Sequence, residues 1–203
     1  MIQIFLKGGP IMWPLLVISL IASTVVLERL FFTFRERMRR DEKAVDRILG
    51  DVAAGQFESA IRHGQGSRDY VARVLTYAMV HREQSHVNAL LRGANRELKR
   101  FNRGLSILDT VITLAPLLGL LGTVTGMIRS FSLLGGQELG APTAITGGIA
   151  EALIATAFGL MVAIIALIPF NYLNTALEEA RHQIEDAASQ FDASIKSLDP
   201  VEA

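Results

Sequence analysis

The stretch that decides the fold runs from Ile145 to Tyr172 and reads ITGGIAEALIATAFGLMVAIIALIPFNY. It is apolar over more than the roughly 20 residues that a helix needs to cross the hydrocarbon core of a membrane. It also carries one carboxylate, Glu151, near its start. Because a charge in hydrocarbon costs on the order of several kcal/mol, such residues usually face a polar cavity or a partner. We therefore expect a membrane-spanning helix with a functional acidic residue.

Two further apolar runs pass the same length test, at residues 11–34 and 105–131. Uninterrupted runs of this length predict helices, because helices satisfy all their backbone hydrogen bonds within one segment. The charges Arg35, Arg37, Arg39 and Arg40 follow the first run instead of preceding it, unlike those of a cleaved signal peptide. The predicted fold class is therefore all-α, an integral membrane protein with three transmembrane helices extended into a cytoplasmic helical bundle.

Basic residues are concentrated between the first two runs, although the formal net charge of the whole chain is zero. Residues 35–104 hold 15 Lys and Arg against 9 Asp and Glu, whereas residues 174–203 hold 2 against 7. Loops rich in Lys and Arg stay in the cytoplasm, and acidic residues contribute little to this rule. The amino terminus is thus expected in the periplasm and the carboxyl terminus in the cytoplasm.

The expected organisation follows from these runs and charges. A short external amino terminus (1–10) precedes the first transmembrane helix (11–34), and a cytoplasmic helical domain (35–104) leads into the second (105–131). An external loop (132–144), the third transmembrane helix (145–172) and a cytoplasmic C-terminal helix (173–203) complete the chain.

The cytoplasmic domain is predicted to be helical, with a break at residues 64–67. Apolar residues recur at helical spacing on both sides of the break, and the stripe is continued by Val87, Leu90, Leu91 and Ala94. No obvious helix breaker separates Arg96 from the second span, so we expect one uninterrupted helix there. The tail carries a similar stripe and is expected to extend the third helix.

Polar residues on the second and third spans predict a route through the bilayer. Asp109, Thr113, Thr123 and Ser130 share one face of a helix by their spacing. Thr156 falls at the membrane depth of Thr123 when the two spans run antiparallel, with Glu151 nearer the external surface and Asp109 near the cytoplasmic end. These side chains together would form a proton pathway or pore lining.

Small residues form flat stripes beside these polar positions. Such stripes let helix backbones approach closely and predict a packed bundle or an oligomer. The helix-packing candidates are Gly119, Gly122 and Gly126 on the second span and Gly148, Ala152 and Gly159 on the third.

Simpler interpretations compete with a polar route. A threonine in a membrane helix often donates only to its own backbone carbonyl three or four residues earlier. Asp109 could reach interfacial water, and Glu151 could stay hydrated near the headgroups. The charged cytoplasmic residues fit a solvated helical bundle better than a nucleic-acid or lipid-headgroup site, so no nucleic acid is expected as a partner.

Metal, cofactor and enzyme chemistry are not expected. The chain has no cysteine, and all four histidines lie outside the apolar runs, so no metal ligands cluster in the membrane. Glu151 and Asp109 lie too far apart in depth to act as an acid and base pair, and no nucleophile lies beside a histidine within the spans.

Two motifs resemble a known family. The segments LAPLLGLLGTVTGM (114–127) and GIAEALIATAFGL (148–160) are similar to the paired signature of the ExbB/TolQ/MotA proton-channel family. Both occur in order, each on a predicted span. Three spans, an external amino terminus and a large cytoplasmic loop resemble the ExbB/TolQ branch more than the four-span MotA branch.

The resemblance implies a function that the spacing alone does not. Members of the family assemble as homo-pentamers in the lipid membrane. Each pentamer surrounds a dimer of a single-span ExbD/TolR-like protein, whose aspartate takes and releases protons. The proton motive force across the bacterial inner membrane then drives movement that is passed to a TonB- or TolA-like protein. By motif position, Thr123, Thr156 and Glu151 match the family's pore-lining residues. A TolQ-like subunit and a non-conducting membrane scaffold remain as alternatives.

Overall fold

The computed structural model describes residues 5, 7–81, 85–134 and 142–198. These residues form α-helices joined by short turns, without strands, so the predicted all-α class is confirmed. The chain divides into two compact units. Unit 1 comprises Met1–Arg29 with Gly104–Tyr172, and unit 2 comprises Leu30–Arg103 with Leu173–Ala203.

Within the described residues, three helices are long and apolar enough to cross a membrane: α2 (Met12–Met38), α7 (Leu105–Leu134) and α8 (Pro142–Leu198). The mean hydropathy of their most apolar windows is 2.0 to 2.5, yet at most 28% of each window is buried. Exposed apolar surface on this scale requires hydrocarbon around it, because water-soluble monomers rarely expose large contiguous apolar patches. The chain is therefore a multi-pass membrane protein.

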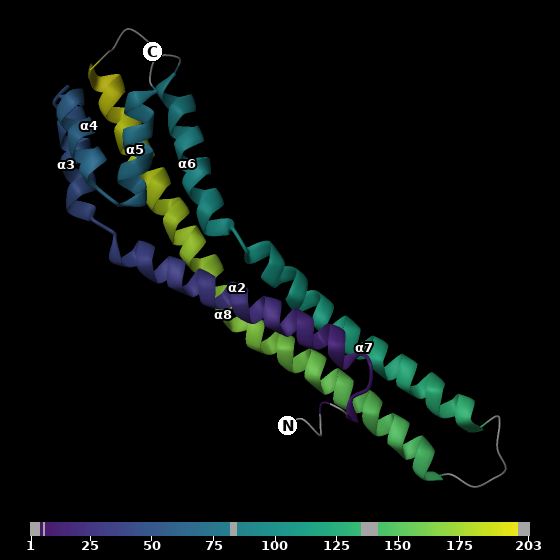
Figure 1. Cartoon of the computed structure of the whole chain (residues 1–203). Helices are drawn as coiled ribbons and strands as arrows, with labels where there is room; N and C mark the ends of the chain where they lie inside the picture. The colour runs from purple at the N-terminus through teal and green to yellow at the C-terminus, as the bar shows by residue number, and fades with distance from the viewer. Residues whose placement is uncertain (1–4, 6, 82–84, 135–141, 199–203) are drawn as a thin grey trace. The chain divides into compact units, whose positions relative to one another are not determined.

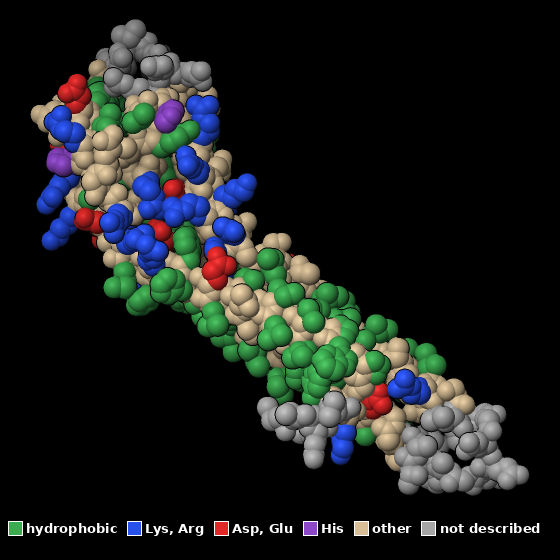
Figure 2. All heavy atoms as spheres, in the orientation of Figure 1, with side chains coloured by type: hydrophobic (Ala, Val, Ile, Leu, Met, Phe, Trp, Pro, Cys, Tyr) green, Lys and Arg blue, Asp and Glu red, His purple; other side chains and the backbone are tan. Residues whose placement is uncertain are grey.

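Unit 1 packs the apolar parts of α2, α7 and α8 against one another (Figure 1). Its buried residues are mostly small, among them Ala22, Ala115, Ala152 and Ala155. Large apolar side chains point outward instead, and Figure 2 shows them covering the visible face of this unit.

Unit 2 adds four shorter helices: α3 (Glu42–Ala53), α4 (Phe57–Gly66), α5 (Tyr70–Val80) and α6 (His86–Asn102). Side chains of Asp41, Asp69 and Ser85 accept hydrogen bonds from the first backbone N–H groups of α3, α5 and α6. Such caps satisfy donors that a helix start leaves unpaired. The core holds larger residues than that of unit 1, including Ile48, Leu75, Ile184 and Phe191.

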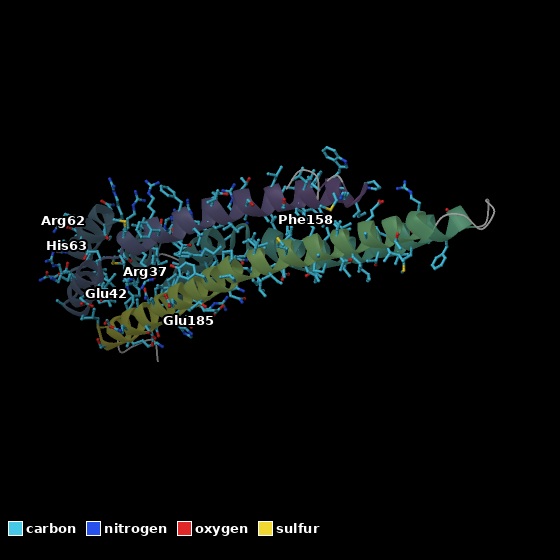
Figure 3. The ribbon with its side chains drawn as sticks, turned by 90° about the horizontal axis from the view of Figure 1, so that it is seen from below. Arg37, Glu42, Arg62, His63, Phe158 and Glu185 are labelled. Carbon is cyan, nitrogen blue, oxygen red and sulfur yellow. The ribbon has the colours of Figure 1, made fainter. Side chains whose placement is uncertain are left out.

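The surface of unit 2 is charged. Figure 3 labels five of its exposed side chains: Arg37, Glu42, Arg62, His63 and Glu185. The sixth label in that figure, Phe158, belongs to unit 1. Asp69 is an exception because its carboxylate is fully buried and accepts from Arg40 and from the backbone N–H groups of Asp41 and Val71.

The structure departs from the expected helices at two places. Arg103 and Gly104 interrupt the expected unbroken helix between the loop and the second span, because Gly104 adopts a φ of +83°, which glycine tolerates best. Val87 and Leu91 are exposed, although they were expected to continue an apolar stripe. Helix α6 buries Ala89, Leu90, Gly93, Glu97 and Phe101 instead.

Other expected boundaries compare directly with the helices. Helix α2 continues four residues past residue 34, and α7 ends at Leu134 instead of 131. Helix α8 extends from Pro142 to Leu198, so the third span and the tail form one helix, as the sequence predicts. Most of the expected external loop and the last five residues lie outside the described residues.

Candidate functional site

The centre of unit 1 is the antiparallel contact between α7 and α8, which is built from glycine and alanine. A Cβ atom added to Gly159 would lie 2.5 Å from the carbonyl oxygen of Ala115, and one added to Gly119 would lie 3.0 Å from Cα of Thr156. At Gly126 the nearest atom would be Cβ of Ala152, at 3.0 Å. The two backbones are therefore too close for larger residues at these positions.

The remaining packing candidates extend this contact. A Cβ on Gly122 would lie 2.7 Å from Cβ of Ala155 and 2.9 Å from Cγ2 of Ile11. Gly148 faces the hydroxyl of Ser130, which would lie 1.9 Å from an added Cβ. All six predicted small residues thus lie on the α7–α8 contact, which Gly122 extends to Ile11.

Thr156 makes a side-chain hydrogen bond between α7 and α8. Its hydroxyl donates to the backbone carbonyl of Gly119 over 2.8 Å. The hydroxyl does not bond to its own helix, so the simpler interpretation of a membrane threonine does not describe it. Thr156 is half-buried, and its oxygen retains capacity to accept a hydrogen bond.

Thr123 and Thr113 follow the simpler interpretation instead. Thr123 donates to the carbonyl of Leu120 over 2.7 Å, and Thr113 donates to the carbonyl of Asp109 over 3.0 Å. Thr123 is half-buried, and it lies one helical turn, about 6 Å, beyond the level where Thr156 meets Gly119. Thr156 therefore lies opposite Gly119 and not at the level of Thr123, although the sequence predicts a common depth for the two threonines.

Glu151 lies at one end of this contact and has a positively charged neighbour. Its Oε1 atom is 3.6 Å from Nη1 of Arg129 on α7, and its side chain is 27% exposed. The carboxylate also lies against the backbone of Gly9, where an added Cβ would be 1.8 Å from Oε1. Gly9 has a φ of +74°, so a side chain there would be strained in its backbone and would displace the Glu151 carboxylate.

The predicted polar face of α7 is divided in the structure. Asp109 and Thr113 are exposed, whereas Ser130 is buried and donates to the carbonyl of Gly126. The division arises because a helix with 3.6 residues per turn drifts around its axis over the 21 residues that separate Asp109 from Ser130. Asp109 and Glu151 are not brought together, since Arg129 lies about 30 Å along α7 from Asp109.

Sequence reasoning missed Arg129 and Gly9. Arg129 could have been found by the same argument that selected Glu151, because a cation in an apolar run also needs a partner. Gly9 gave no comparable signal, since its importance depends on a contact between residues far apart in the chain.

The site offers hydroxyl groups, a carboxylate and a guanidinium, which can exchange hydrogen bonds with water or with a protonated side chain. No group of three metal-ligating side chains occurs in the described part of the chain. The arrangement therefore supports proton or water contacts along the α7–α8 contact.

Comparison with known proteins points to the same region. A family model described as the MotA/TolQ/ExbB proton channel family matches residues 62–186, which include α7 and most of α8. The match covers more than half of the chain and both motifs singled out in the sequence.

Individual relatives agree with the family model. ExbB-like protein 1 of Synechocystis is 42% identical over 176 residues, covering 83% of this chain and 68% of that protein. ExbB-like protein 3 of Synechocystis is 31% identical over 195 residues, covering 92% and 91%. The Tol-Pal system protein TolQ of Haemophilus influenzae is 39% identical over 97 residues, covering 48% of this chain and 42% of TolQ.

Proposed function

Since the chain belongs to the MotA/TolQ/ExbB proton channel family and is a multi-pass inner-membrane protein, we propose that it is the ExbB-like subunit of a proton-driven motor. In this proposal it assembles as a pentamer around the helices of an ExbD-like dimer. The motor uses the proton motive force to energise a TonB-like protein and transport across the outer membrane.

The observation that carries this proposal is the position of Thr156 within the family match. The residue lies on a contact of small side chains near the middle of the apolar run 145–172, yet its hydroxyl bridges two helices. A helix that only anchors the chain needs no such group. We propose that Thr156, Thr123 and Glu151 supply hydrogen-bond partners to the protonatable aspartate of the ExbD-like subunit.

The proposal includes an orientation and a chemical limit. The amino terminus lies in the periplasm and the carboxyl terminus in the cytoplasm, because Arg35 to Arg40 follow α2's apolar part. The subunit has no enzymatic activity of its own, and the free energy comes from the proton gradient. Each proton that crosses the membrane down its gradient releases about 2.3 kcal/mol of free energy per 100 mV of membrane potential. This is enough to bias a rearrangement of hydrogen bonds among the polar side chains of the pore.

Proton flux into liposomes, followed with a pH-sensitive dye, tests the proposal. The chain is reconstituted with and without its ExbD/TolR-like partner, and Thr123→Val and Glu151→Ala are compared with wild type at equal assembly. We expect partner-dependent flux in wild type and its loss in both variants. Thr125→Val serves as a control, because Thr125 also donates to carbonyls of its own helix, Leu121 and Gly122, but is exposed where Thr123 is half-buried.

A TolQ-like role is the second candidate, and the match to TolQ of Haemophilus influenzae favours it specifically. Copurification with a TolA-like instead of a TonB-like protein would select it. A non-conducting scaffold is the alternative from another class, because the hydroxyls of Thr123 and Thr156 already have acceptors within the chain. Absence of flux in wild type, or flux indifferent to every substitution, would select the scaffold.

A further inference from the structure

Unit 2 contains a cavity that the proposed motor function does not use. It lies between α5 and α6 and has a volume of about 390 Å³. Its lining holds three arginines, Arg73, Arg96 and Arg100, together with Tyr77, Gly93 and Glu97. Small-molecule sites typically begin at about this size, with a few polar groups that fix the ligand.

Two buried carboxylates balance only part of this positive charge. Glu36 and Glu97 are 2% and 7% exposed. Arg73 donates to both, over 3.1 Å and 2.8 Å, and Arg100 donates to Glu97 over 2.7 Å. These contacts raise the pKa of Arg73 above its ordinary value even though burial opposes the charge, so its guanidinium is permanently charged.

Two of the arginines that line the cavity have donors without a partner among the described residues, one donor buried and the others exposed. Nε of Arg73 is buried without a hydrogen bond. Arg96 is exposed and makes no ion pair or side-chain hydrogen bond with any described residue. Because a buried unpaired donor costs about 1–3 kcal/mol, each such group in a native structure calls for an explanation.

More guanidinium groups lie beside Arg73. The pKa of Arg39 is lowered from its ordinary value by partial loss of hydration and then by the positive charges of Arg35, Arg68 and Arg73. The charges of Arg39 and Arg73 are therefore close enough to interact, Arg35 and Arg68 add positive charge around Arg39, and Glu36 offsets part of it. Figure 2 shows Lys and Arg side chains gathered on the visible face of unit 2.

We infer that the cavity between α5 and α6 binds an anionic phosphate group, carried by a lipid headgroup or by a small molecule in solution. Guanidinium groups match the geometry of phosphate oxygens and form paired, charge-assisted hydrogen bonds with them. Arg96 supplies a guanidinium group with no competing carboxylate partner among the described residues, and Tyr77 lines the same cavity. Glu97 is a carboxylate and would repel the phosphate, but it also forms ion pairs with Arg73 and Arg100 and so fixes the positions of these two arginines.

Titration of the full chain in phosphatidylcholine nanodiscs tests the inference in two arms. One arm adds inorganic phosphate and follows heat by calorimetry. The other replaces part of the lipid with phosphatidylglycerol and counts retained phosphatidylglycerol by native mass spectrometry. The variants are Arg96→Gln and, as a matched control, Arg92→Gln, which lies one turn earlier on α6 and does not line the cavity.

We expect saturable binding that Arg96→Gln weakens about tenfold and Arg92→Gln leaves within about twofold. Binding in the first arm identifies a soluble ligand, and binding in the second arm alone identifies a lipid headgroup. Absence of saturable binding in both arms would overturn the inference. Equal weakening by the two substitutions would overturn it as well, because that result indicates diffuse surface charge.

Discussion

The two units hold cavities of the same volume and opposite chemistry. The cavity of unit 1, between α2 and α8, measures about 390 Å³ and is lined by two serines and by apolar side chains, among them Phe158, which Figure 3 labels. The cavity of unit 2 has the same volume and is lined by arginines. The apolar lining of the first cavity suits a lipid environment, and the charged lining of the second suits an aqueous one.

The two units also differ in which residues they bury and which they expose. Unit 1 exposes most of its large apolar residues and buries many glycines and alanines beside a few larger residues such as Met12 and Leu15, whereas unit 2 has charges outside and large apolar residues inside. Lipid offers no hydrophobic driving force between helices, so unit 1 depends on close backbone packing. Water does provide such a driving force, so unit 2 depends on the burial of large apolar residues and on hydrogen bonds to buried carboxylates such as Asp69.

The substitution with the largest expected effect removes one buried carboxylate of unit 2, that of Asp69. Asp69→Ala leaves Arg40 and several backbone N–H groups without their acceptor, so we expect a loss of about 3–5 kcal/mol of unfolding free energy. Hydrogen exchange of the α5 amides in detergent measures it, and protection should fall about a hundredfold or more. Asp46→Ala is the control, since Asp46 is exposed; an equal effect of both substitutions would contradict the account.

A pair of glycine substitutions tests the packing of unit 1. Gly159→Ala places a methyl group 2.5 Å from the carbonyl oxygen of Ala115, and we expect a loss of about 1–3 kcal/mol. Gly147→Ala has nothing within 4 Å of the new atom, so better helix propensity should stabilise α8 by up to about 1 kcal/mol. Thermal unfolding in detergent measures both. Equal changes would show that helix propensity, and not contact between helices, decides stability in unit 1.

Acid gives the smallest expected effect and acts on unit 2. Hydrogen bonds from Lys196 and then His86 lower the pKa of Asp192 below its ordinary value. A carboxyl group whose pKa is lower in the folded state stabilises the fold above the unfolded value, near 3.9, and this contribution disappears as the pH falls through the folded value. Because Asp192 and its partners Lys196 and His86 are partly exposed, we expect this carboxyl group to contribute less than about 1 kcal/mol to the free energy of unfolding.

Melting temperatures of wild type and Asp192→Asn, compared at about pH 6 and about pH 3, measure this contribution. The variant should be less stable than wild type at the higher pH and should lose less stability on acidification. A variant that loses as much stability as wild type would show that other carboxyl groups dominate the acid response.

The sequence predicted most of the helices because apolar runs and helical periodicity are local properties. It predicted the small-residue faces of α7 and α8 for the same reason. The direction of individual side chains was less predictable, since Ser130 is buried and Asp109 exposed although their spacing predicts a common face. Contacts such as Glu151 with Arg129 and Gly9 depend on how distant segments meet, and no local pattern encodes that.

The most direct test of the account is proton flux through Thr156→Val and Thr156→Ser, each reconstituted with the ExbD/TolR-like partner at verified assembly. Valine keeps the shape of threonine but removes the hydroxyl that bonds to Gly119, whereas serine keeps the hydroxyl and removes a methyl group. The account predicts that partner-dependent flux is lost with valine and largely retained with serine. Equal flux in wild type and both variants would contradict it.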